Sequence, residues 1–202
     1  MDIVSEQHDL LLFSSDCASP AMTDESLLKA AAHGDESSFC LLYERHRDVV
    51  FRFAYRLLQS VELAEEITHD CFLSLIKRPG LFDARKASLK TYLCAAARNQ
   101  AYKRWNKSSP ETSLEELSVE PQEAEFRSPL RQVMGAELSV IVQKAIAELP
   151  PLQREAVILF EFEDLSLAEI AEVVNADVGT VKSRLHRARE KLRVLLEPYM
   201  KG

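Results

Sequence analysis

Apolar residues recur every three or four positions along most of the chain, a period that predicts α-helices rather than strands. Up to residue 107 the pattern predicts helices at about residues 25–32, 36–59, 61–77 and 88–105. The turn signals that separate them are Gly34-Asp35, Gln59-Ser60 and Pro79-Gly80. Residues 1–21 show little periodicity and are predicted to form a flexible tail.

The composition changes after this first helical segment. Residues 108–129 contain three prolines, six glutamates and a single basic residue, which is typical of a flexible acidic linker. Helical periodicity resumes near residue 136, with breaks at Leu149-Pro150-Pro151 and at Asp164-Leu165. The second of those prolines suits the first turn of a new helix. We therefore predict an all-α fold with a tail (1–21), a helical domain (22–107), a linker (108–135) and a second helical domain (136–202).

The second domain contains the pattern of a helix-turn-helix. Ser166 followed by Glu169 is a capping box, which predicts that a short helix begins there and extends to about residue 174. A three-residue turn follows, and Asp177 is suited to cap the next helix. That helix is predicted to end before Pro198. Two helices joined by so short a turn form a helix-turn-helix.

The second helix of this motif has one apolar and one basic side. Its predicted packing stripe consists of Val181, Leu185, Ala188, Leu192 and Leu195. From residue 178 to the end there are seven basic and two acidic residues, although the whole chain carries a net charge of −7. A basic helix after a capped turn can bind phosphates and base edges in the major groove. The alternative is the solvated face of an ordinary amphipathic helix.

Residues 85–107 form a second basic segment, with seven basic residues and no acidic ones. Tyr92, Tyr102 and Trp105 are interleaved with them. Basic groups beside aromatic rings fit single-stranded nucleic acid, whose phosphates need charge and whose unstacked bases need a flat partner. Alternatively, some of these rings belong to the core.

The predicted helix at residues 61–77 is acidic outside its core stripe. That stripe is formed by Leu63, Ala64, Ile67, Cys71 and Leu75. The remaining positions mix acidic or polar with large apolar side chains, at Glu65, Glu66, His69, Asp70, Phe72, Leu73 and Ile76. Such a mixture is typical of a protein interface. A helix wedged between two neighbouring helices would have the same pattern.

Composition argues against membrane proteins, metalloproteins and enzymes. No apolar run approaches the roughly 20 residues of a membrane span, and no signal peptide is recognisable, which predicts a cytoplasmic protein without membrane insertion. The four cysteines form no C-x-x-C pair, so we predict packed free thiols, no bound metal and no cofactor. The five histidines are scattered without a carboxylate or cysteine constellation, which argues against an enzyme.

Three motifs resemble parts of bacterial sigma factors. Residues 63–72 resemble the acidic polymerase-binding helix of sigma region two, and residues 89–99 resemble the helices that melt and read the minus-ten promoter element. Residues 178–189 resemble the recognition helix of sigma region four, which reads the minus-thirty-five element. In this order and at this spacing, the motifs resemble an extracytoplasmic-function (ECF) sigma factor over about residues 22–196.

The resemblance implies that Glu65, Glu66 and Asp70 contact the β′ clamp helices of core RNA polymerase. The residues that it implies for the minus-ten element are Arg85, Lys86, Lys90, Tyr92, Arg98, Asn99, Lys103 and Arg104. For the minus-thirty-five element they are Lys182, Ser183, Arg184, His186 and Arg187. It also implies the β flap and an anti-sigma factor as partners. His69, Tyr92 and His186 depart from the residues that are usual in the family.

The function implied is therefore a sigma subunit, which binds core RNA polymerase and directs promoter-specific initiation and opening of promoter DNA without catalysis of its own. The alternative is a helix-turn-helix regulator that does not act as a sigma subunit. The acidic helix and the basic aromatic segment argue against that alternative, because a simple regulator needs neither.

Overall fold

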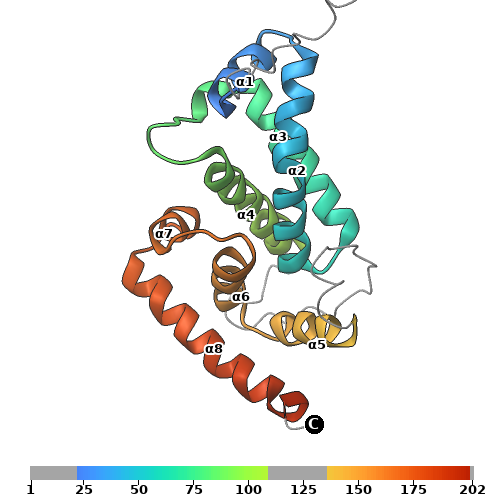
Figure 1. Cartoon of the computed structure of the whole chain (residues 1–202), viewed down its shortest axis with the longest axis vertical. Coiled ribbons are helices and arrows are strands. Elements are labelled where there is room, and N and C mark those ends of the chain that lie inside the picture. The colour runs from blue at the N-terminus through green and yellow to red at the C-terminus, as the bar shows by residue number, and fades with distance from the viewer. Residues whose placement is uncertain (1–21, 109–135, 201–202) are drawn as a thin grey trace, which may run out of the picture.

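A computed structural model describes residues 22–108 and 136–200, and the secondary structure in these ranges is helical (Figure 1). The first range contains α1 (Asp24–Ala32), α2 (Glu36–Leu58), α3 (Val61–Lys77), the 3-10 helix η1 (Pro79–Leu81) and α4 (Leu89–Ser108). The second contains α5 (Ala136–Ala147), α6 (Pro151–Val157), the π-helix η3 (Ile158–Phe162), α7 (Leu167–Val174) and α8 (Val178–Met200). The predicted all-α fold is confirmed. The predicted tail, and the linker from residue 109 to residue 135, lie outside the described residues.

The first range forms the N-terminal unit, in which α2 packs against α1, α3 and α4 (Figure 1). Its helices begin where polar side chains can cap them, as at Asp35, whose carboxylate accepts from the N–H groups of Ser37 and Ser38. α2 ends at Leu58 and is capped by Gln59, which adopts a left-handed conformation with φ 56°. These local caps explain why the helix boundaries were predictable to within a few residues.

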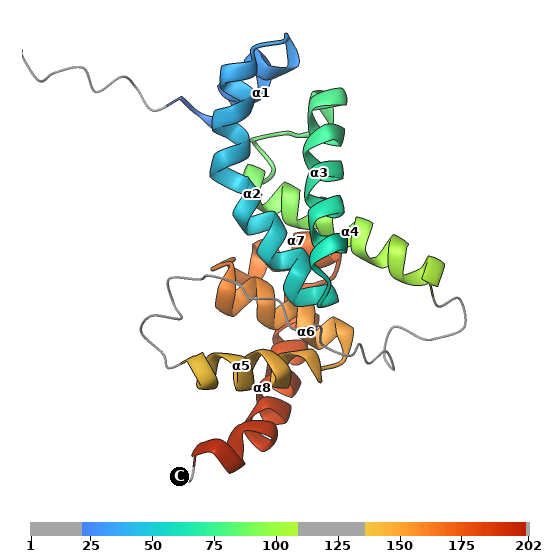
Figure 2. The same cartoon turned by 90° about the vertical axis from the view of Figure 1, so that its right-hand side faces the viewer.

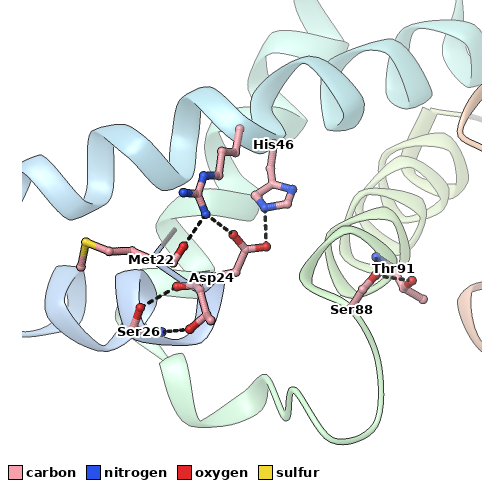
Figure 3. A network of polar contacts seen from close by, with 8 residues as sticks. Met22, Asp24, Ser26, His46, Ser88 and Thr91 are labelled. Atoms are coloured by element: carbon pink, nitrogen blue, oxygen red, sulfur yellow. Dashed lines mark hydrogen bonds and ion pairs between the residues drawn. The ribbon is translucent and has the colours of Figure 1, made fainter. Parts of the chain in front are cut away.

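Polar contacts fix the start of α1 on α2. Thr23 caps α1 by accepting from the N–H of Ser26 at 3.3 Å. The Asp24 carboxylate lies 2.8 Å from Nε2 of His46 and 3.1 Å from Nη1 of Arg45 (Figure 3). At the first turn of α4, in the same view, Ser88 Oγ accepts from the N–H of Thr91 at 3.1 Å. These contacts hold α1 against α2 and define where α4 begins.

The second range forms the C-terminal unit, in which α5, α6 and α7 pack against α8. Pro151 is the first residue of α6, as predicted. The π-helix after it was not predicted, and Asp164, with φ 50°, follows it. The prediction that α8 stops before Pro198 is wrong, because the helix continues through the proline and ends at Met200. The carbonyl of Val194, which the proline leaves without its helical N–H donor, belongs to a residue that is 64% exposed, so water can replace that donor.

The two units dock against each other. α4 packs against α7, and α2 packs against α5, α6 and η3 (Figures 1 and 2). Buried apolar residues of both units belong to one continuous cluster, which includes Phe53 and Leu57 from α2 and Ile158 from η3. The sequence predicted two helical domains and gave no sign of this docking.

The cysteines of the described residues are free thiols in different environments. Cys71 in α3 and Cys94 in α4 are 2% and 0% exposed, and burial raises the pKa of each thiol to about 12. The prediction of packed thiols is confirmed for these two. It is wrong for Cys40, which is exposed on α2. Cys17 lies outside the described residues.

Candidate nucleic-acid interface

Helices α7 and α8 form the predicted helix-turn-helix. The capping box at the start of α7 is complete, since Ser166 Oγ accepts from the N–H of Glu169 and the Glu169 carboxylate accepts from the N–H of Ser166 at 2.9 Å. Asn175 ends α7 in a left-handed conformation with φ 50°. The Asp177 carboxylate accepts from the N–H of Thr180 at 2.8 Å, and its hydrogen bonds with Thr180 lower its pKa. Both ends of the turn are therefore fixed by side chains.

This turn presents one face of α8 to solvent. Val181, Leu185 and Ala188 are 3% exposed or less and anchor the helix to the unit. Four of the five residues assigned by resemblance to the minus-thirty-five element are exposed, and they are Lys182, Ser183, His186 and Arg187. The fifth, Arg184, differs, because its side chain is 19% exposed and lies 3.2 Å from a carboxylate oxygen of Glu155.

Half of the residues assigned to the minus-ten element are exposed, and they are Arg85, Lys86, Asn99 and Lys103. Arg85 precedes α4 and donates to Asp83, with Nε 3.0 Å from Oδ1. These hydrogen bonds from Arg85 lower the pKa of the Asp83 carboxyl to about 2. The remainder of the set is engaged within the protein.

The aromatic residues of the basic segment pack against other side chains. Tyr102 and Trp105 are 9% and 8% exposed, and their rings stack with centroids 6.0 Å apart. Tyr92 is partly buried against Phe82, edge to face at 5.6 Å. The alternative that some of the interleaved rings belong to the core is therefore confirmed for Tyr102 and Trp105.

α3 packs between α2 and α4, which is one of the two alternatives that its sequence left open. Phe72 is 1% exposed and packs edge to face on Tyr43 at 4.8 Å, so the helix is wedged against α2. Glu65 and Glu66 are nevertheless exposed, and the Asp70 side chain is 45% exposed. Arg104 lies beside these acids rather than on an open DNA-facing surface. Its Nη2 is 2.6 Å from Asp70, and its Nε is 3.6 Å from Glu66.

Two buried glutamates of the C-terminal unit lie between the docked units. Glu155, in α6, is fully buried, and its carboxylate accepts from Arg98 at 2.7 and 3.2 Å. It also accepts from the Tyr102 hydroxyl at 2.8 Å and from Arg184 at 3.2 Å. Arg98 and Tyr102 belong to α4, whereas Arg184 belongs to α8. One carboxylate therefore joins groups from both units.

Glu163, directly after η3, is the second of these glutamates and is 1% exposed. Its carboxylate lies 3.1 Å from Arg56 and 3.8 Å from Arg52, and its carbonyl accepts from Lys90. Burial raises the pKa of the Glu163 carboxyl to about 7 against the opposing effect of these three cations, and neighbouring Asp164 also raises it. The same burial lowers the pKa of Arg56.

Arg154 is a buried cation held by backbone carbonyls. Its guanidinium donates to the carbonyls of Leu57 at 2.9 Å, Leu149 at 3.1 Å and Ala147. Leu57 lies in the last turn of α2, so this arginine ties the N-terminal unit to the connection between α5 and α6. Burial lowers its pKa to about 10.

Comparison with known proteins identifies the family. A family profile described as Sigma-70 region 2 matches residues 42–110, and one described as Sigma-70, region 4 matches residues 139–192. The ECF RNA polymerase sigma factor SigW of Bacillus subtilis is 33% identical over 174 residues, which is 82% of this chain and 92% of that protein. This chain is an ECF sigma factor.

Other matches are consistent with this assignment. ECF RNA polymerase sigma factor SigE of Mycolicibacterium smegmatis is 30% identical over 198 residues, covering 94% of this chain and 75% of that protein. Two solved structures share the fold, one of the sigma factor RpoE and one of CnrH. RpoE of Bartonella quintana has a TM-score of 0.60 and 24% identity over 80% of this chain and 98% of its own. CnrH has a TM-score of 0.63 and 23% identity over 87% of this chain and 97% of its own.

The sigma factor therefore binds core RNA polymerase and directs transcription from promoters, and α7 and α8 belong to its region four. Among the described residues, no group of histidines, cysteines and carboxylates could hold a metal ion. Nor does any helix in these ranges have the length and hydropathy needed to cross a membrane.

The raised pKa of Glu163 predicts that the stability of the sigma factor depends on pH. A carboxyl whose pKa is higher in the folded state binds a proton on folding, so its contribution is largest below its unfolded pKa of about 4.5 and is lost as pH rises through about 7. We expect the stability of the wild type relative to Glu163→Gln to fall by about 2 kcal/mol between pH 5 and pH 8. Urea unfolding at several pH values measures this difference.

Glu161→Gln is the matched control for this titration, because Glu161 lies in the π-helix that Glu163 follows and its side chain is 47% exposed. Its stability relative to the wild type should change little over the same pH range. Parallel pH profiles for the wild type and Glu163→Gln would show that the Glu163 carboxyl does not titrate in this window.

Proposed function

We propose that this sigma factor reads the minus-thirty-five element with the exposed face of α8. The observation that carries the proposal is that a capped helix-turn-helix presents Lys182, Ser183, His186 and Arg187 to solvent on the side opposite its apolar anchor. Lysine and arginine bind phosphates, and arginine can also pair with the edge of a guanine. Arg184 would join this surface from its flank while paired with Glu155.

We also propose that the minus-ten element binds along α4 and the segment before it. Arg85, Lys86, Asn99 and Lys103 are exposed in the docked arrangement. Lys90 and Arg98 are engaged by residues of the C-terminal unit, so their use on DNA requires the units to separate. Tyr92 would contribute from its partly buried position against Phe82. Arg104 is held by Asp70 and Glu66, which favours a role in positioning α3 over one on DNA.

The acidic surface of α3, formed by Glu65, Glu66 and Asp70, is the proposed site for the β′ clamp helices. Reversing all three residues to lysine should weaken binding to core RNA polymerase at least about tenfold, because an electrostatic surface loses its complementarity. The helix should remain folded, since its buried residues are unchanged. Titration of labelled sigma factor with core enzyme measures the affinity, and far-UV circular dichroism checks the fold.

A matched control reverses three other exposed acids, Glu44, Asp48 and Glu148, and so changes the net charge by the same amount. This variant should bind core enzyme within about threefold of the wild type. Equal affinities for the two triple variants would contradict the assignment of the acidic surface to the polymerase.

The function itself is tested by run-off transcription with core RNA polymerase and promoter fragments from the source genome. We expect transcripts only when the sigma factor is added. Failure on every fragment, in spite of measurable binding to core enzyme, would count against promoter-directed initiation.

We further propose that the sigma factor acts in the cytoplasm, that its region four also binds the β flap, and that an anti-sigma factor regulates it. The last proposal is supported by a solved structure with the same fold, which is described as a complex of the sigma factor RpoE with the anti-sigma factor NepR.

A further inference from the structure

The two DNA-binding elements proposed above share one buried carboxylate. Arg98, on α4, is assigned to the minus-ten element, and Arg184, on α8, is assigned to the minus-thirty-five element. Both donate to Glu155, which has no exposed surface. Their own side chains are 16% and 19% exposed. In this arrangement the Arg98 guanidinium is occupied by a carboxylate of the other unit and is not free to approach a DNA phosphate.

The geometry at Arg98 resembles phosphate recognition. Its Nε lies 2.7 Å from one carboxylate oxygen of Glu155, and a terminal nitrogen lies 3.2 Å from the other. Arginine uses the same two-pronged arrangement on carboxylates and on phosphates. The Tyr102 hydroxyl adds a third donor at 2.8 Å, and burial raises the pKa of Tyr102, so this phenol keeps its proton. Glu155 therefore occupies the position of an anion on α4.

Other contacts between the units have the same polarity, with the exception of the hydrogen bond from Arg154 to the carbonyl of Leu57. The donors come from the N-terminal unit and the acceptors from the C-terminal unit, as when Lys90 donates to the carbonyl of Glu163. Thr91 donates to the Glu169 carboxylate at 3.1 Å, and Glu169 is the residue that completes the capping box of α7. The docked surface thus covers part of the basic segment with acceptors from α6, η3 and α7.

We propose that Glu155 is an intramolecular latch, which holds the two units together by occupying the anion site on Arg98 and keeps Arg98 away from DNA until the units separate. The proposal rests on the proposed function only in assigning Arg98 to DNA. The closed arrangement itself is a property of the free sigma factor.

The latch is asymmetric. Arg184 and Glu155 belong to the same unit, so their ion pair survives when the units separate. Arg98 belongs to the other unit and leaves with α4, after which its guanidinium can bind water or a phosphate. Removing one partner of a buried ion pair leaves the other without compensation, which strongly disfavours the docked state. A change at Glu155 therefore shifts the balance towards the open state.

The test uses single-molecule fluorescence energy transfer on the full-length sigma factor, without DNA or polymerase. Labels on unnatural amino acids replace Glu44 in α2 and Val194 in α8, which are both exposed. We expect the wild type to give mainly a high-transfer population. Glu155→Gln should raise the ratio of open to closed molecules by roughly tenfold or more. Glu161→Gln, which loses an exposed pair with Arg189 within the C-terminal unit, should match the wild type.

Two results would overturn the latch: a wild type that is mainly open, or Glu155→Gln with the wild-type transfer distribution and native circular dichroism. If Glu155→Gln loses its helical signal, Arg98→Gln decides, since it leaves the pair of Glu155 with Arg184 in place. Arg98→Gln should open the units to a similar extent, and an unchanged distribution overturns the proposal. Loss of promoter binding does not enter this readout, so failure of the proposed function remains distinguishable.

Discussion

Replacing Arg154 by leucine should lower the free energy of unfolding by about 3 kcal/mol. The Arg154 guanidinium is fully buried and donates to the carbonyls of Leu57, Leu149 and Ala147. Leucine fills part of the space but donates nothing, so these carbonyls would be left without this donor. An unpaired buried polar group costs about 1–3 kcal/mol, and the relief of the arginine's own burial offsets part of the sum. Urea unfolding followed by far-UV circular dichroism measures the change.

Arg193→Leu is the matched control, because the Arg193 side chain is 74% exposed. Among the described residues it forms an ion pair only with Glu190, one turn earlier on α8, at 3.1 Å. An exposed ion pair of this kind contributes less than about 1 kcal/mol. Equal, small losses of stability in both leucine variants would show that the hydrogen bonds from Arg154 to these carbonyls do not stabilise the fold.

Replacing Arg187 by alanine should weaken binding to the true minus-thirty-five element by about 1–3 kcal/mol. The affinity for scrambled DNA should change little. Arg187 is exposed on α8, on the side away from Val181 and Leu185, which anchor the helix. A side chain there can reach base edges while the helix stays in place. The measurement is promoter affinity of the complete complex with core polymerase, on matched and scrambled fragments, as a function of salt.

Lys182→Ala is the comparison variant within the same helix. Lys182 is exposed near the edge of the outward face, so we expect it to contact phosphate. Its loss should weaken binding to both fragments similarly and reduce the salt dependence. Equal losses on both fragments for Arg187→Ala would leave a basic surface without base reading.

The elements of the fold that could be predicted from sequence are those defined by neighbouring residues. The capping box of Ser166 and Glu169, the turn at Asn175 and the proline that opens α6 each act within a few residues, and each was found where expected. The helix-turn-helix follows from these signals alone. The predicted end of α8 was wrong, because a proline near an exposed helix end destabilises the helix less than one in an interior turn.

Docking of the units could not be predicted, because the contacts that define it join residues far apart in the sequence. Arg98 and Glu155 are separated by 57 positions, and Lys90 and Glu163 by 73. From sequence, Arg98 is one basic residue among seven in an acid-free segment, and nothing nearby indicates its neutralising partner. The adjacent charges of Arg154 and Glu155, directly before the apolar residues 156–160, were the available signal, and the periodicity alone did not distinguish them from surface residues.

The buried thiols of α3 and α4 can serve as chemical probes of the unfolding of the N-terminal unit. Only the thiolate reacts with alkylating reagents, and with pKa values of about 12 Cys71 and Cys94 are almost entirely protonated at neutral pH as well as enclosed. Of the cysteines in the described residues, Cys40 alone is exposed and should be modified at once. Modification of Cys71 and Cys94 then reports how often the N-terminal core opens, at equilibrium and without denaturant. Mass spectrometry after alkylation for different times would thus measure how often the N-terminal core opens in the intact transcription complex.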